Sequence, residues 1–166
     1  MLNQKMIMET QSQINTMEIA NLLYKYCEFI DSGDLVSASL LFRHAKLKLI
    51  TSNELQDYKA MLALLQQAIV IYSNGTPRTK HVLSNPIIHI DEEKGTASSQ
   101  SYYTVFQATE SIPLQVIATG RYFDKFEYIE GHWRFSYRES QSDMLGNISG
   151  HIRLDEVLSK QLNTQN

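Results

Sequence analysis

The sequence predicts a single α+β domain in which N-terminal helices cover one face of a strongly curved antiparallel sheet of four to six strands. The first half of the chain carries apolar residues at helical spacing, and the second half carries four long runs rich in β-branched and aromatic residues. Short turns join those runs, so the strands pair antiparallel and the helices pack together on one side. A chain of 166 residues with 43% hydrophobic composition suits one core.

The first predicted helix follows residues 1–13, which are polar and Met-rich and which we expect to form a disordered or extended leader. Asp31 falls on the buried side of this helix. Gly33 suits the left-handed conformation that ends a helix, and Asp34 can cap a second helix over residues 35–42. The apolar stripe of the first helix consists of Met17, Ala20, Leu23, Tyr24, Cys27 and Ile30.

A short strand and a third helix are expected next. Residues 45–50 alternate leucine with lysine, as a half-buried strand does. The third helix is predicted to start near Ser52 or Asn53 and to end at the Asn-Gly-Thr-Pro segment 74–77. Its apolar face would hold Leu55, Tyr58, Met61, Leu62, Leu65, Ile69 and Tyr72.

Four long strands should complete the domain, which we place at residues 14–151. The remaining residues, 152–166, suit a short helix over 154–158 and a polar tail. Turn residues separate the strands at 91–95, around 111–113 and at 130–131. The predicted strands are 79–90, 96–109, 114–129 and 133–142.

Composition excludes several classes of function. A net charge of −3 with scattered lysines and arginines offers no basic surface for nucleic acid. Cys27 is the only cysteine, so neither an internal disulfide nor a Cys-based zinc cluster can form. No apolar run reaches membrane-spanning length and no signal peptide is evident, so we expect a cytoplasmic protein away from membranes. No glycine-rich phosphate loop or Rossmann fingerprint occurs, and we expect no cofactor and no metal.

Two titratable side chains on otherwise apolar elements point to a site. Asp31 lies on the buried side of a helix end, and His81 lies in the first predicted long strand. Because buried polar groups need partners, we expect a mutual contact or a site there. In the alternative interpretation, Asp31 only caps the corner or bonds backbone amides, and His81 is a satisfied core residue. The histidines His44, His89, His132 and His151 carry less weight, since none shows a ligand spacing.

The order of elements and several local motifs resemble the SnoaL-like branch of the nuclear-transport-factor-two-like superfamily. That branch includes scytalone dehydratase, hexachlorocyclohexane dehydrochlorinase and the small subunits of ring-hydroxylating dioxygenases. The similarity spans roughly residues 14–151. The matching segments are residues 23–27 leading to 31–34, Leu41-Phe42, 78–81 leading to Asn85-Pro86, 120–124, 131–135 leading to Arg138, and 143–151.

This resemblance implies a cone-shaped fold, with a bent sheet around a hydrophobic pocket, and dimerisation through the outer face of the sheet. It also implies that Asp31 pairs with His81 to abstract a proton from a substrate carbon, and that Arg138 assists a leaving group or a developing negative charge. Two departures stand out. Arg43-His44 replace an acidic residue of many relatives, and residues 99–101 lack the second pocket histidine of scytalone dehydratase.

Further residues are expected to line the pocket. Alternation from His81 would put Asn85 on the same wall, although Pro86 beside it favours a bulge instead. Whether Arg138 faces the cavity stays open, because a bulge would reverse the alternation along its strand, and a solvated or ion-paired arginine is the alternative. The aromatic residues that we expect to contact substrate are Tyr26, Tyr103, Tyr122 and Trp133.

The leading functional hypothesis is a cofactor-independent lyase or isomerase acting on a small, largely apolar and cyclic molecule. His81 would be the general base and Asp31 its orienting partner, with Arg138 or Tyr26 as an electrostatic helper. The alternative is a non-catalytic ligand-binding or assembly subunit, as dioxygenase small subunits are. Both alternation sets of the sheet carry apolar residues, which also predicts a homodimer with sheets packed back to back.

Overall fold

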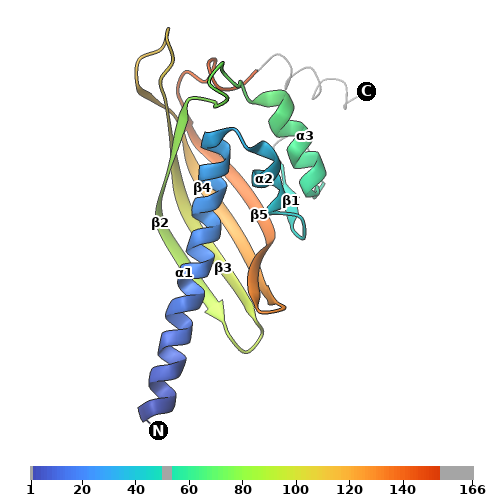
Figure 1. Cartoon of the computed structure of the whole chain (residues 1–166), viewed down its shortest axis with the longest axis vertical. Helices are drawn as coiled ribbons and strands as arrows, with labels where there is room; N and C mark the ends of the chain where they lie inside the picture. Colours follow the sequence, from blue (N-terminus) through green and yellow to red (C-terminus); the bar gives the residue numbers. More distant parts are fainter. Residues whose placement is uncertain (1, 50–53, 154–166) are drawn as a thin grey trace.

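A computed structural model describes residues 2–49 and 54–153, and it has the predicted α+β architecture. Figure 1 shows a long helix, α1 (Leu2–Ser32), lying along one face of a curved sheet. Two shorter helices, α2 (Leu35–Leu40) and α3 (Tyr58–Ala68), sit near the end of the sheet where α1 finishes. The helix predicted over residues 154–158 and the polar tail lie outside the described residues.

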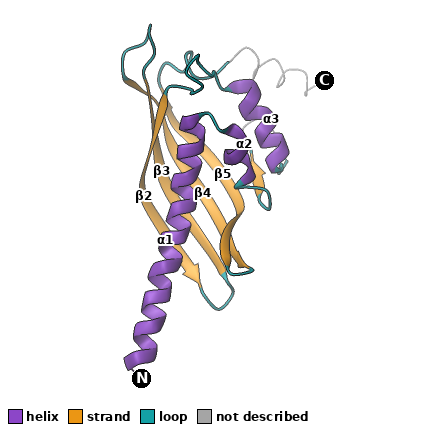
Figure 2. Cartoon of the chain, viewed as in Figure 1, coloured by secondary structure: helices purple, strands orange, loops and turns teal. Residues whose placement is uncertain are grey.

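The sheet has five strands in the order β1-β5-β4-β3-β2. The four long strands are antiparallel, while β1 (Lys46–Lys48) adds to the edge of β5 in parallel. Figure 2 shows how the strands bend together around the helical side. The long strands agree with the predicted ranges to within a few residues: β2 (Thr79–Asp91), β3 (Thr96–Gln107), β4 (Gln115–Ile129) and β5 (His132–Leu145).

The first helix differs from the prediction at its start. It begins at Leu2, so residues 2–13 are helical where the sequence predicted a disordered or extended leader. No glycine or proline precedes Gly33, and the intrinsic helix propensity of this polar segment lets the helix continue without a buried face. Figure 1 shows these first turns projecting past the sheet, and Met6 and Ile7 are exposed there.

The buried stripe of α1 is rotated from the predicted one. Met17 and Tyr24 are 66% and 47% exposed, whereas Ile19 and Tyr26 are buried. Leu23, Cys27 and Ile30 are buried as predicted. The helix carries two overlapping stripes of apolar residues, and the sequence alone does not show which of them packs against the sheet.

The corner after α1 forms as predicted. Gly33 has a φ of +82°, and a side chain there would collide with the carbonyl oxygen of Gly75 in the turn before β2. Asp34 caps α2 by accepting from the backbone N–H of Ser37 at 2.9 Å. The third helix is shorter than expected, because Asp57 supplies its N-cap and the chain leaves the helix after Ala68.

The core lies between α1, α2 and the concave face of the sheet. Phe42, Phe126 and Phe135 are almost fully buried, and the ring of Phe135 lies 4.5 Å from that of Phe42 and 4.8 Å from that of Phe126. Among the described residues, no helix is long and apolar enough to cross a membrane.

Bulges change which side chains face this core. The pairing of β3 with β4 shifts between Val105 and Phe106 and leaves Ile117 as the extra residue of β4, so Ile117 and Tyr122 are both buried although strict alternation predicted opposite faces. A shift in the pairing of β4 with β5 leaves Ser136 as the extra residue between Phe135 and Tyr137. Alternation predicted from sequence therefore fails beyond each bulge.

Candidate functional site

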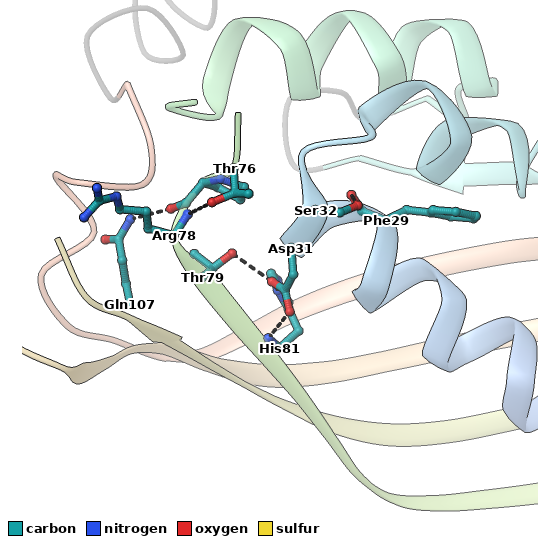
Figure 3. A network of polar contacts seen from close by, with 9 residues as sticks. Phe29, Asp31, Ser32, Thr76, Arg78, Thr79, His81 and Gln107 are labelled. Carbon is teal, nitrogen blue, oxygen red and sulfur yellow. Dashed lines mark hydrogen bonds and ion pairs between the residues drawn. The ribbon is translucent and has the colours of Figure 1, made fainter. Parts of the chain in front are cut away.

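Asp31 and His81 contact each other as predicted. Asp31 comes from the last turn of α1 and His81 from the start of β2, and Figure 3 shows the two side chains turned toward each other. The His81 Nδ1 lies 2.6 Å from the Asp31 Oδ1. Thr79 Oγ1 donates to the same carboxylate oxygen at 2.8 Å, and the His81 backbone N–H donates to Oδ2 at 2.7 Å. Thr79 and His81, which are neighbouring inward-facing residues of β2, thus supply three donors that hold the Asp31 carboxylate in place.

The electrostatics favour an ionised Asp31. Burial alone would raise the pKa of this carboxyl group, but the hydrogen bonds and charge of His81, with the hydroxyl of Thr79, outweigh burial and lower it. Because an ionised carboxylate only accepts, His81 Nδ1 carries the hydrogen and Nε2 holds the lone pair of the neutral ring. Nε2 has no hydrogen-bond partner among residues 2–49 and 54–153.

Both interpretations of Asp31 thus hold in part. The backbone amide of His81 occupies one carboxylate oxygen, as a structural role requires, and the imidazole occupies the other. The side chains of His81 and Asp31 are 8% and 9% exposed, so the contact is shielded from bulk water. A cleft of about 440 Å³ has Asp31 and Thr79 in its wall, but not His81.

A second histidine lies beside the first. The ring of His151 packs edge-on against the ring of His81, with the two ring centres 6.5 Å apart. Burial, with a smaller effect from the charge of His81, lowers the pKa of His151 to about 4, while Asp31 opposes this shift. His151 is therefore neutral at pH 7. No role was predicted for His151, because seventy residues and three strands separate it from His81 along the chain.

Arg138 points inward and is ion-paired, which settles the orientation left open by the sequence. The bulge at Ser136 reverses the alternation of β5, so that Phe135 and Arg138 share the concave face. Its guanidinium binds the Asp124 carboxylate through two hydrogen bonds of 2.7 and 2.9 Å. Burial opposes the charged guanidinium, but the adjacent Asp124 carboxylate outweighs it and raises the pKa of Arg138.

Aromatic rings surround this guanidinium. Its central carbon lies 4.2 to 5.0 Å from four ring centres, and Nη1 has no hydrogen-bond partner in the part of the chain that the structure describes. Asp124 balances the charge through Nε and Nη2, so Nη1 is the guanidinium nitrogen whose donors are unused in the described part of the chain. The four rings belong to Tyr26, Phe42, Tyr122 and Phe135.

Three of the four aromatic residues expected in the pocket form one cluster. Tyr103 stacks on Tyr122 at 4.6 Å, and Tyr26 meets Tyr122 edge-on at 5.9 Å. Tyr103 pairs across the sheet with Leu83, two residues after His81, so the cluster lies between the histidine and Arg138. Burial raises the pKa of Tyr26 to about 12, which keeps its hydroxyl protonated as a donor.

Two expected contacts lie elsewhere. Trp133 is buried against Tyr128 beside the β4–β5 turn, about ten residues along the strands from the level of His81, or roughly 30 Å at ~3.3 Å per residue. Asn85 is exposed in a bulge of β2 with a φ of +52°, as Pro86 suggested. Neither residue is positioned to contact a molecule held at His81.

The residues of the site do not suggest a metal centre. Within residues 2–49 and 54–153, no group of three or more His, Cys, Asp or Glu side chains converges as metal ligands would. The functional groups that do converge are an imidazole with an oriented carboxylate, a neutral imidazole, and tyrosine hydroxyls. Such groups can move a proton and hydrogen-bond an oxygen atom.

Comparison with solved structures identifies the class of fold. A nuclear-transport-factor-two-like protein with a cystatin-like fold from Novosphingobium aromaticivorans superposes with a TM-score of 0.64 at 17% identity, covering 82% of this chain and 87% of that one. A candidate scytalone dehydratase from the same organism gives 0.64 at 20% identity, covering 84% and 91%. The β subunit of a candidate aromatic-ring-hydroxylating dioxygenase, also from that organism, gives 0.63 at 21% identity, covering 81% and 93%.

The family follows from the sequence itself. The profile of the SnoaL-like domain matches residues 15–139, three quarters of the chain, and the protein belongs to this family. The family resemblance and the fold predicted from the sequence are thereby confirmed. No curated protein matches the sequence.

Proposed function

We propose that this protein is a cofactor-independent lyase or isomerase that abstracts a proton from carbon in a small, largely apolar molecule. The observation that carries the proposal is the 2.6 Å contact between His81 Nδ1 and the Asp31 carboxylate, with Nε2 left unpaired. A carboxylate on Nδ1 fixes the tautomer of the ring and stabilises the imidazolium that forms when Nε2 takes a proton. The likeness to a candidate scytalone dehydratase is consistent with this chemistry.

The proposed step balances without an added reagent. His81 Nε2 takes the proton, the C–H bond breaks, and its electron pair stays in the substrate. In an isomerase this pair forms an enolate, and the imidazolium returns the proton to another carbon. In a lyase the pair forms a double bond and expels a group from the adjacent carbon. The Arg138 Nη1 and the Tyr26 hydroxyl are the donors available for developing negative charge.

Deuterium exchange tests the proposal without knowledge of the natural substrate. In D₂O the wild-type protein should accelerate loss of the α-proton signals of 2-tetralone, followed by proton NMR. His81→Gln should reduce the catalysed rate by about a hundredfold or more, as expected for loss of a general base. Asp31→Asn should also lower it, since an amide can hold the opposite tautomer. Exposed His89→Gln is the matched control, and equal rates for His81→Gln and wild type would rule the mechanism out.

A non-catalytic binding or assembly subunit is the second candidate. It is supported by the likeness to a dioxygenase β subunit and by apolar side chains on the outer face of the sheet. Val82, Ile87 and Tyr102 are 49%, 57% and 42% exposed there, and Val116 is 44% exposed. Co-purification with a larger subunit, together with no His81-dependent exchange, would favour this role.

The same face supports a homodimer with sheets back to back. An apolar surface of this kind on a monomer is unfavourable in water, and a second copy would cover it. Light scattering should then give about twice the chain mass of 19.1 kDa. Val82→Lys with Tyr102→Lys should convert the dimer to monomer, and a wild-type monomer would contradict the arrangement.

A further inference from the structure

The C-terminal segment brings a second histidine, His151, to the site. The matched region ends at residue 139, and His151 lies twelve residues later and packs against His81. Only 9% of His151 is exposed, so its ring belongs to the interior.

Hydrogen bonds on both sides of His151 hold its backbone in place. The Gly150 carbonyl accepts from Tyr72 Oη and from Gln107 Nε2, both at 2.8 Å. The carbonyl of His151 itself accepts from the Val70 backbone N–H at 2.9 Å. Arg153 then donates from its backbone to Ala68 and from its side chain to Ile69, at 2.8 Å each. The backbone that carries the ring is thus anchored to the end of α3, to the segment after it and to β3 before any ligand arrives.

The two imidazoles have unused hydrogen-bonding capacity. The buried Nδ1 of His151 has no partner among the described residues. The ring of His81 is hydrogen-bonded to Asp31 through Nδ1, which leaves Nε2 as its second hydrogen-bonding atom. A neutral imidazole carries one donor and one acceptor, and buried polar atoms of native proteins nearly always have partners. Packing alone does not explain a histidine at this position, since an apolar ring of similar size would fill the space without an unpaired nitrogen.

We propose that His151 is a substrate contact whose imidazole hydrogen-bonds an oxygen atom of the molecule that meets His81. The substrate class that follows is a small ring compound carrying a hydroxyl or carbonyl group near the carbon that loses its proton. This inference rests on the proposed function for the identity of the reacting carbon, but the oxygen contact itself is a statement about binding.

His81 and His151 have complementary roles in this proposal. His81 receives the proton from carbon, and the electron pair released by the C–H bond moves onto the carbonyl oxygen. A neutral imidazole donates a hydrogen bond to that oxygen without placing a second positive charge beside the imidazolium that forms on His81. The low pKa of His151 is consistent with this division of roles.

Phenol and toluene test the oxygen contact, since the two rings are close in size and differ in the hydroxyl group. Histidine ring ¹⁵N shifts and backbone amide shifts of ¹⁵N-labelled protein would be followed during titration with each. Wild type should bind phenol about tenfold more tightly than toluene, as one buried hydrogen bond allows, with the shifts centred on His151 and His81. His151→Phe should lose this preference while keeping its affinity for toluene. His151→Gln, which retains a donor, should keep part of the preference.

His132→Phe, at the exposed β4–β5 turn, is the matched control and should behave as wild type. A phenol preference that survives in His151→Phe, or the absence of saturable shifts at the His151 ring with either probe, would overturn the inference. Circular dichroism establishes that each variant is folded. Failure of the proposed function can be told apart from failure of this inference. If His81 is not a base, deuterium exchange will not depend on His81, but the preference for phenol over toluene will remain.

Discussion

Replacing His151 by phenylalanine should make the stability of the protein less sensitive to acid. In the folded state burial holds the pKa of His151 at about 4, against 6.5 for an ordinary histidine. Between these values the unfolded chain binds the proton and the folded chain does not, so stability falls as the pH falls from about 6.5 to about 4. The groups that face the ring are His81 and Asp31, and both remain in the variant.

The size of the effect follows from the two pKa values. At about 1.4 kcal/mol for each tenfold change, His151 costs the folded state about 2 kcal/mol at pH 5 and about 3 kcal/mol at pH 4. The phenylalanine variant should therefore gain about 2 kcal/mol relative to wild type on going from about pH 7.5 to about pH 5. Any packing penalty of the larger ring is the same at both pH values and cancels in this difference.

Urea unfolding of wild type and His151→Phe at the two pH values measures the difference directly, provided that the slopes agree. The exposed His132→Phe should leave the acid dependence as it is in wild type. An unchanged stability difference between the His151→Phe variant and wild type at the two pH values would show that His151 titrates normally in the folded protein. The persistence of the neutral imidazole of His151 in the folded protein below about pH 6.5 would then be refuted.

Three other substitutions test separate parts of the structure. Gly120→Ala should destabilise the fold by about 2 kcal/mol or more in chemical unfolding, because its new methyl group would collide with backbone and with a tyrosine ring; a neutral result would contradict the close packing. Asp124→Ala should cost about 3 to 5 kcal/mol by leaving the Arg138 guanidinium buried and unpaired, while combining it with Arg138→Met should recover much of that loss. If the double variant is no more stable than Asp124→Ala, the unpaired charge is not the cause. Thr79→Val should cost about 1 kcal/mol and lower the exchange rate through Asp31, and an unchanged rate would mean that this hydroxyl does not help to orient the carboxylate.

Local chemistry predicted most of the fold. The Gly33-Asp34 corner and the strand ranges depend on residues whose preferences act over a few positions, and both agree with the structure. The Asp31–His81 contact joins residues fifty positions apart, and it was expected because buried polar groups need partners and because the family resemblance implies the pair. The start of α3 shows the limit of this approach. Serine, asparagine and aspartate are all good N-caps, and only the structure shows that Asp57 is the one used.

The side-chain environment of the site was harder to predict. The inward orientation of Arg138 depends on one bulge at Ser136, which the sequence does not mark with a glycine or proline. His151 reaches His81 only because the C-terminal segment folds back over the end of α3, a long-range packing event with no local signal. Trp133 was misplaced for a simpler reason: aromatic residues are equally suited to core and pocket.

The length of α1 allows the arrangement of a dimer to be tested by one distance measurement. Its 31 residues span about 45 Å, with Asp31 in the last turn and the exposed first turns beyond the far end of the sheet. A spin label or fluorophore near Met6 therefore lies well away from any molecule at His81. Since α1 runs along the concave face, back-to-back sheets would hold two such labels on opposite outer sides of the assembly. Contact through the helices would bring the labels much closer, so one distance measurement distinguishes the two ways of pairing.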